Sequence, residues 1–247
     1  MTEFGKTVQG AWSTGTAVIL SGDGTSGKRH TLELEAERFR DKRKVNAKHI
    51  RIQPESDLIK HIRNVIDEIT PWSVPRDWRR NSVGRMAGML TRRLDTLGIG
   101  LLLFSNCQVV DHTFYEVIFD VLGEFRRRGQ KFGLVLAGRG QTEHFVNETR
   151  AHCGLVRQYA RVPKMSVGDV MAALKDWCRA EEFIQKAEGG DIEAQDAIER
   201  VCEGIGGNIG RLLTFAQVKN DRFSRREFSE DLVEEVFASL RQPDPEK

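Results

Sequence analysis

A glycine-rich turn near the start of the chain carries the residues best suited to chemistry. Gly22, Gly27 and Lys28 fit the spacing G-x-x-x-x-G-K, and the apolar segment 17–21 precedes them. In such a turn the backbone N–H groups can surround an anion, and the first turn of a following helix adds positive potential. Lys28 would then reach the terminal phosphates of a nucleotide. The candidate nucleotide-binding residues in this segment are Gly22, Asp23, Gly24, Thr25, Ser26, Gly27, Lys28, Arg29 and His30.

The residue after Lys28 departs from the pattern. A Ser or Thr normally stands there, and its hydroxyl ligates the Mg²⁺ that accompanies the nucleotide. Arg29 cannot ligate a cation, although its guanidinium could lie near the phosphates and replace part of the metal's charge. Thr31 lies about 200° farther around a helix and is a poor substitute. The sequence predicts ATP as the cofactor and leaves open whether Mg²⁺ accompanies it; a glycine turn without a ligand is the alternative.

A second position that should hold the metal is also altered. The most apolar segment, 99–104, is expected to be a buried strand, and in nucleotide hydrolases such a strand ends in a metal-holding Asp, usually followed by Glu. Here Ser105 and Asn106 stand in those places. Asn106 can orient a water but is a poor base, and Asp111 lies too far along the chain. We therefore expect weak or absent ATP hydrolysis, and we assign no catalytic residue and no metal ligand. The alternative is that the two motifs are misaligned.

Short apolar segments alternate with amphipathic ones over the first two thirds of the chain. The expected strands are 17–21, 49–52, 99–104 and 132–138, and the expected helices are 29–44, 57–69, 83–97 and 114–128. This alternation indicates βαβ units and a parallel sheet, so we predict an α/β nucleotide-binding core over 1–163 that begins with an arm, 1–16. Only helical patterns follow, at 167–186, 191–203, 208–219 and 229–240. They predict a small helical lid over 164–240, before a disordered tail, 241–247.

Bulk composition gives no sign of a membrane or a secreted protein. A net charge of +2 gives no overall attraction to nucleic acid or lipid. The four cysteines lack metal-binding spacing, and dispersed cysteines of this kind indicate free thiols in a reducing compartment. The chain shows no leader segment and no apolar run of the roughly 20 residues that a bilayer requires. We therefore expect a cytoplasmic protein without a membrane partner.

Four segments carry a family resemblance: the loop GDGTSGKR, the strand LLLFSNCQ, the strand FGLVLAGRGQ and the lid segment GIGGNIGRLL. Together they resemble the AAA+ ATPases and, within them, the small transposition regulators of the TniB, TnsC and MuB type, and the resemblance runs from residue 10 to residue 240. The third segment is similar to the family's sensor-1 strand, whose polar residue would be Arg139 or a neighbour. In the fourth, Gly-Asn-x-x-Arg begins a helix, and Arg211 is similar to the arginine that senses the terminal phosphate.

The resemblance implies a P-loop AAA+ fold, with a three-layer αβα core, a parallel sheet and a helical lid. It also implies that copies stack into a filament or ring. Each nucleotide would then lie at a boundary between copies, completed by an arginine finger from the neighbour. Arg150, Arg157 and Arg161 lie where this finger is expected, and we favour Arg157. A solvated surface arginine is the alternative for each.

Basic residues gather in four segments. These are Arg38, Arg40, Lys42, Arg43, Lys44 and Lys48; Arg76, Arg79, Arg80, Arg85, Arg92 and Arg93; Arg126, Arg127, Arg128 and Lys131; and Arg222, Arg225 and Arg226. Trp72 and Trp78 are interleaved in the second, and arginines beside exposed tryptophans suit phosphates and sugars. The resemblance implies that this segment faces DNA, so the candidate DNA-binding residues are Arg76, Arg79, Arg80 and Arg85. A solvated helix face is the alternative.

Three functions remain open. The resemblance implies an AAA+ regulator of DNA transposition that oligomerises on double-stranded DNA, marks the target and recruits a transposase or a target-selector protein. The altered positions imply that it hydrolyses ATP weakly or not at all. One alternative is a catalytically dead adaptor that acts through protein partners without nucleotide. Another is an active ATPase with unusual metal chemistry.

Overall fold

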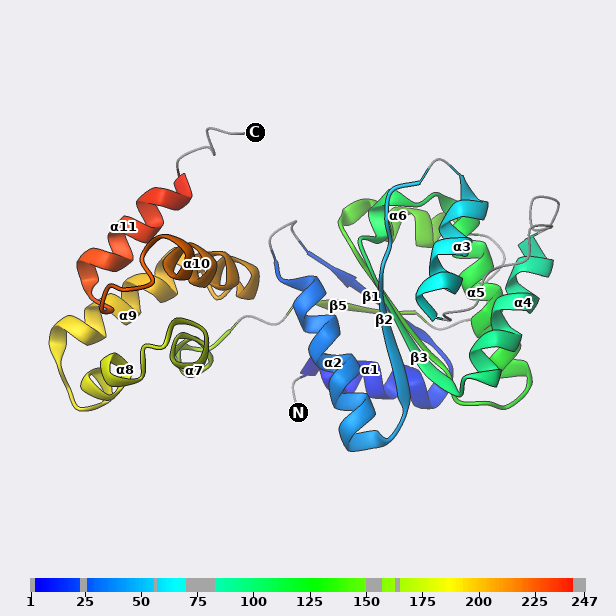
Figure 1. Ribbon diagram of the computed structural model, residues 1–247. Coiled ribbons are helices and arrows are strands. Elements are labelled where there is room, and N and C mark those ends of the chain that lie inside the picture. The colour runs from blue at the N-terminus through cyan, green and yellow to red at the C-terminus, as the bar shows by residue number, and fades with distance from the viewer. Residues whose placement is uncertain are drawn as a thin grey trace. The chain divides into compact units, whose positions relative to one another are not determined.

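The computed structural model describes residues 3–22, 26–55, 57–69, 83–149, 157–162 and 165–241. The chain divides into two compact units. The first comprises Met1–Gly24 and Lys28–Pro163, and the second comprises Thr25–Gly27 and Lys164–Lys247. The first unit is built on a β-sheet and the second on helices (Figure 1). Each unit buries apolar cores of its own.

A parallel sheet runs through the first unit in the order β2-β3-β4-β1-β5. Its strands are β1 (Ala17–Ser21), β2 (Asn46–Arg51), β3 (Ile99–Ser105), β4 (Gly133–Gly138) and β5 (Arg157–Arg161). The central strands β1, β3 and β4 are buried almost throughout, which is why each is a continuous apolar run in the sequence. The four expected strands are present, and β5 is a further strand that the sequence did not predict.

Helices cover both faces of this sheet and make three layers (Figure 1). The helices of one face are α1 (Glu3–Thr14) and α2 (Lys28–Arg43), and those of the other are α3 (Leu58–Ile69), α4 (Val83–Thr96), α5 (His112–Arg127) and α6 (Gly140–Glu148). The α/β class with a parallel sheet and three layers, predicted from the sequence, is therefore confirmed. A short 3₁₀ helix, η2 (Cys107–Val109), follows β3.

The first segment of the chain is a helix, where we expected an arm. Phe4, Val8 and Ala11 recur at helical spacing along α1 and are buried against the sheet. Arg38 of α2 fastens the start of this helix, because its Nη2 donates to the carbonyl oxygen of Gly5 at 2.9 Å. The segment is thus an integral layer of the first unit.

Within the described residues, five helices form the second unit around Leu174, Val201 and Phe215. They are α7 (Val167–Cys178), α8 (Glu181–Glu188), α9 (Ile192–Ile205), α10 (Ile209–Arg222) and α11 (Glu230–Arg241). The single helix predicted over 167–186 was wrong, because the chain takes a left-handed conformation at Arg179 (φ 55°), which ends α7, and α8 begins two residues later. None of the helices in the described part of the chain has the length and apolarity to span a bilayer.

Candidate nucleotide-binding site

The glycine-rich turn joins β1 to α2 at the carboxyl edge of the sheet. Asp23, Gly24 and Thr25 lie outside the described residues. Gly27 has a φ of 77°, a left-handed conformation that favours glycine. Lys28 begins α2, and its Nζ donates to the carbonyl oxygen of Gly22 at 2.6 Å. The ammonium group therefore bends back over the turn, where a phosphate held by the turn would meet both the charge of Lys28 and the amino terminus of α2.

A chain of polar contacts joins Arg29 to Ser105. Arg29 Nε donates to Oε1 of Glu33, one helical turn along α2, at 2.8 Å. The same oxygen lies 3.7 Å from Nδ1 of His49 on β2. Nε2 of His49 lies 2.9 Å from Oγ of Ser105 at the end of β3. The two positions that depart from the metal-binding pattern are therefore connected to each other through Glu33 and His49.

The surroundings of His49, at the centre of this chain, favour its neutral form. Burial lowers the pKa of His49, Glu33 opposes that shift, and Arg29 adds to it. A proton on Nδ1 would face the Glu33 carboxylate and leave Nε2 to accept from the hydroxyl of Ser105. Ser, His and a carboxylate in this order also occur in hydrolytic triads. Ser105 is only 4% exposed, however, so the arrangement is a structural bridge and not a nucleophile facing a substrate.

Asn106 bonds to the chain itself. Its backbone is left-handed (φ 68°), and its Nδ2 donates to the carbonyl oxygen of Ile52 at 2.9 Å. Its Oδ1 accepts from Nε2 of Gln108 at 2.5 Å. The donor end of the amide thus holds the end of β3 to the segment after β2, and the acceptor end holds η2, whereas the sequence suggested an amide that orients water. A cationic Arg29, a bonded Ser105 and this amide do not fit a Mg²⁺ site.

Two residues near these positions were not among the predicted site residues. Oε1 of Gln108 is a buried acceptor without a hydrogen-bond partner among the described residues. Arg139, named from the sequence only as a sensor-1 candidate, is exposed at the start of α6, directly after β4. Since β4 lies between β1 and β3, Arg139 emerges from the sheet between the glycine-rich turn and Ser105. No described group of three His, Cys, Asp or Glu side chains is placed to hold a metal.

The other predicted site residues are dispersed. His30 is half-buried on α2, and Arg85 is exposed on α4. Arg157 is the first residue of β5, but its side chain is not described. The other predicted arginines outside the described residues are Arg76, Arg79, Arg80 and Arg150. These assignments stay predictions.

Arg211 belongs to the second unit. It is exposed on α10, whose first turn is capped by Asn208, since the Asn208 side chain accepts from the backbone N–H of Gly210 and of Arg211. Arg211 lines a groove of about 1050 Å³ together with carboxylates that include Glu203 and Glu234. The predicted start of a helix at the Gly-Asn pattern is confirmed, and the phosphate-sensing role of Arg211 stays a prediction.

The buried histidine makes the stability of the chain depend on pH. Because the pKa of His49 is lower in the folded protein than its usual value of 6.5, the unfolded chain binds more protons below that value. The stabilisation is complete above about pH 6.5 and is lost as the pH falls through the folded-state pKa. We expect His49→Gln to flatten the fall of the melting temperature between neutral and acidic pH, as measured by calorimetry. The exposed-site control His112→Gln should follow the wild type, and a His49→Gln curve parallel to the wild type would contradict this assignment.

Comparison with known proteins identifies the fold. Neither a protein-family model nor a curated protein matches the sequence. The Walker-type ATPase paby2304 of Pyrococcus abyssi matches with a TM-score of 0.58 and 15% identity, over 96% of this chain and 71% of that one. A chain of the Drosophila ORC bound to DNA matches with a TM-score of 0.55 and 12% identity, over 97% of this chain and 62% of that one. Domain III of the Thermotoga maritima replication initiation protein DnaA matches with a TM-score of 0.51 and 12% identity, over 97% of this chain and 90% of that one. The chain therefore has the P-loop fold of AAA+ ATPases and spans less than two thirds of the Drosophila chain.

Proposed function

We propose that this chain is a nucleotide-binding regulator of DNA transposition of the TniB, TnsC and MuB type. It would assemble on double-stranded DNA, mark the target and recruit a transposase or target-selector protein, while hydrolysing ATP weakly or not at all. The fold, which is similar to that of a Drosophila ORC chain bound to DNA, is consistent with this proposal. The choice of transposition regulators among proteins of this fold rests on the sequence segments that resemble them.

The observation that carries the proposal is the polar chain from Arg29 to Ser105. Both positions that would hold a magnesium ion are committed to contacts with Glu33 and His49. Lys28 and Arg29 still place two cationic side chains at the amino terminus of α2, which suits the phosphates of a nucleotide. Binding of ATP would then be retained without a means of activating water. A regulator of this kind keeps its nucleotide, so its assembly on DNA would not be ended by its own hydrolysis.

One observation favours a second candidate, the adaptor that works without nucleotide. The bond from Lys28 Nζ to the carbonyl oxygen of Gly22 satisfies the turn with the chain's own groups. An adaptor would keep that bond permanently, whereas a nucleotide-binding protein would exchange it for phosphate. The third candidate, an active ATPase, requires Mg²⁺-dependent turnover that Lys28→Ala abolishes.

Charge reversal in the segment 70–82 tests the proposed function. The triple variant Arg76→Glu, Arg79→Glu and Arg80→Glu should lose assembly on duplex DNA, because cations that neutralise phosphates are replaced by groups that repel them. Mass photometry and electron microscopy with DNA and ATP measure the assemblies.

A variant with the same change of charge serves as the control. It reverses the exposed Lys60, Lys175 and Lys186 to Glu, and it should assemble as the wild type does. If the triple variant also assembles normally on DNA, the assignment of the segment 70–82 to DNA is wrong.

A further inference from the structure

The amino edge of the sheet, opposite the glycine-rich turn, has an unusual residue in one of its turns. Among the described residues, four helix-to-strand turns lie at this edge, and each contains a residue with a left-handed backbone. Three of them use glycine: Gly15 (φ 65°), Gly98 (φ 61°) and Gly129 (φ 67°). The fourth, between α2 and β2, uses Lys44 (φ 55°). Lysine is less favourable than glycine in this conformation, so folding alone does not explain its presence.

The turn with Lys44 lies beside a second basic turn, that between α5 and β4. Both meet at Gly100 in β3, where an added Cβ would lie 2.9 Å from Cγ1 of Val45 and 3.8 Å from the carbonyl oxygen of Lys131. Trp12 lies between them, with its Nε1 3.3 Å from the same point. Lys131 places its Nζ over the ring of Trp12, 5.3 Å from the centroid. Segments far apart in the sequence therefore form one continuous surface.

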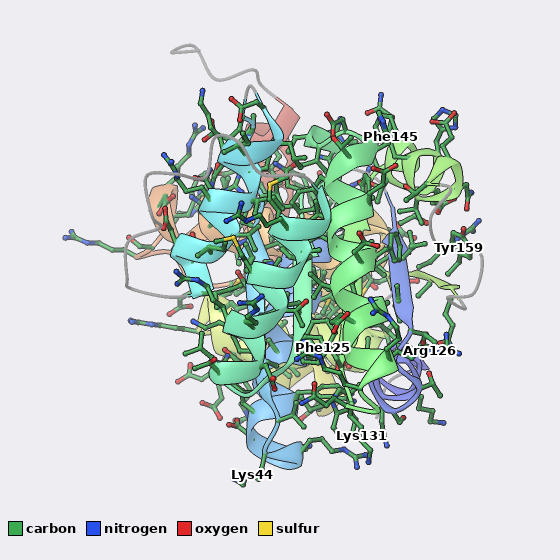
Figure 2. All side chains as sticks on the ribbon, turned by 90° about the vertical axis from the view of Figure 1, so that its right-hand side faces the viewer. Lys44, Phe125, Arg126, Lys131, Phe145 and Tyr159 are labelled. Atoms are coloured by element: carbon green, nitrogen blue, oxygen red, sulfur yellow. The ribbon has the colours of Figure 1, made fainter. Side chains whose placement is uncertain are left out.

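We call this surface the basic edge. It consists of the exposed residues Arg40, Lys42, Arg43, Lys44, Arg126, Arg127, Arg128 and Lys131. Arg126 lies beside the turn between α1 and β1, since a Cβ added to Gly15 would be 3.7 Å from the Cβ of Arg126. Figure 2 shows the labelled Lys44, Arg126 and Lys131 toward the same end of the first unit.

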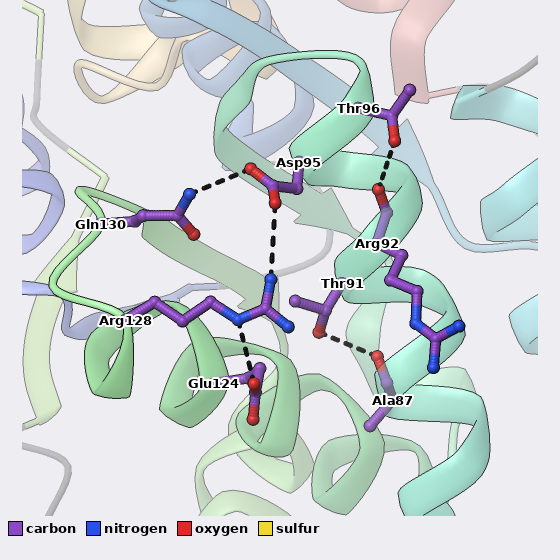
Figure 3. A network of polar contacts seen from close by, with 8 residues as sticks. All are labelled: Ala87, Thr91, Arg92, Asp95, Thr96, Glu124, Arg128 and Gln130. Atoms are coloured by element: carbon purple, nitrogen blue, oxygen red, sulfur yellow. Dashed lines mark hydrogen bonds and ion pairs between the residues drawn. The ribbon is translucent and has the colours of Figure 1, made fainter.

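Two of the carboxylates at this edge, Asp95 and Glu124, are already used by two of its arginines. Arg128 contacts Asp95 at 3.4 Å and Glu124 at 3.0 Å, and Arg127 contacts Glu124 at 2.6 Å. Gln130 Nε2 also donates to Asp95, so this network fastens the turn before β4 to α4 (Figure 3). It leaves the basic side chains at the end of α2, and Lys131, without an ion pair among the described residues.

Helix ends explain only part of this charge. Basic side chains in the last turn of a helix compensate its dipole, and Arg43, Arg126 and Arg127 can serve that purpose. Lys44 and Lys131 lie beyond the last turns of α2 and α5 and are not needed there. Arg43 bonds to a neutral partner, since its Nη2 donates to Oε1 of Gln9 at 2.6 Å. This bond does not offset the positive charge of Arg43.

We propose that the basic edge binds the phosphate backbone of duplex DNA, without reading its sequence. Cations presented on a rigid surface suit a regular row of phosphates, and such contacts position DNA without specifying bases. A membrane-binding surface would carry apolar side chains among the cations. Of the large apolar side chains that are exposed in the described residues, only Leu97 belongs to a turn at this edge. None of its residues is among the DNA-binding candidates Arg76, Arg79, Arg80 and Arg85, and the surface binds DNA whether or not the chain assembles.

Replacing Lys44 by glycine separates the proposed role from a structural one. Lys44→Gly should keep or raise the melting temperature, because glycine prefers the left-handed backbone. It should also weaken binding to a short fluorescent duplex, and the slope of log Kd against log salt should fall by about one for each phosphate that is no longer neutralised. Lys44→Arg keeps the charge and should bind as the wild type does. A Lys44→Gly protein with unchanged affinity and salt slope overturns the proposal.

A double reversal tests both sides of the surface together. Lys42→Glu with Lys131→Glu should lower the affinity for duplex DNA on the order of tenfold at physiological salt. The control Lys60→Glu with Lys186→Glu changes the charge equally at other exposed positions and should have no such effect. The measurement is made without nucleotide, on a duplex too short for assembly, so that its result does not depend on the proposed regulator function.

The same assay distinguishes other occupants. Vesicles of phosphatidylserine and phosphatidylcholine, or single-stranded RNA, are added as competitors of the labelled duplex. Duplex DNA should remain the preferred ligand. Tighter binding of either competitor, abolished in the double-reversal variant, would show that the surface serves that ligand and would overturn the assignment to DNA. Equal affinities of the reversal and control variants for DNA would overturn it as well.

Discussion

Replacing Lys28 by alanine is expected to abolish the rise in melting temperature that ATP produces. A ligand that binds only the folded state, present at a hundred times its Kd, adds about 2.7 kcal/mol to the free energy of unfolding. For a protein of this size that corresponds to roughly 5–10 °C. Without the Lys28 ammonium, the turn loses the charge that bends back over Gly22. Differential scanning fluorimetry in EDTA measures the shift, which should persist in the wild type because Arg29 stands where a metal ligand would be.

The exposed variant Lys60→Ala is the control and should keep the full response to ATP. A shift that appears only with Mg²⁺ would show that Arg29 does not replace the charge of the metal. No shift in the wild type, with or without Mg²⁺, would favour the adaptor that works without nucleotide.

Truncating Phe104 to alanine is expected to lower the melting transition of the first unit without moving that of the second. Phe104 is fully buried at the end of β3, with its ring 5.8 Å from that of Phe114 in an edge-to-face arrangement. Removing such a ring costs about 3–5 kcal/mol, because the cavity is only partly refilled. The transition should fall by roughly 6–20 °C in differential scanning calorimetry.

The reciprocal variant is Phe215→Ala in the second unit. Phe215 is also fully buried, and its ring lies 5.1 Å from that of Phe237 within a separate core. It should lower only the other transition. Leu34→Ala, at a site 48% exposed, should change the free energy of unfolding by no more than about 0.5 kcal/mol. A single transition that both phenylalanine variants lower equally would contradict independent unfolding of the two units.

The fold was predictable where burial leaves a strong pattern. The runs that became β1, β3 and β4 are apolar at nearly every position because both faces of the sheet are covered. The sequence of β5, Arg-Gln-Tyr-Ala-Arg, lacks such a run, since an edge strand is buried less. The spacing of Phe4, Val8 and Ala11 did signal α1, but it was not recognised. The break at Arg179 carried no glycine or proline to mark it.

The unusual residues of the candidate site could be predicted from the sequence, but the contacts that connect them could not. Arg29 and Ser105 depart from a pattern that can be read one residue at a time. The link between them depends on Glu33 one helical turn beyond Arg29, and on the register of β2 against β3, which brings His49 beside Ser105. Register is a property of two strands paired in space, and the spacing within either strand does not reveal it.

The two edge strands limit how copies of the chain can join. In the described part of the chain, β2 and β5 each pair on one side only, and such strands can recruit a strand from another molecule. Here β2 carries Lys48 and Arg51, and β5 begins and ends with arginine. Like charges facing each other across a new strand pair would oppose it. These charges oppose edge-to-edge aggregation when many copies are crowded together, so we expect an ordered assembly to form through helices and loops.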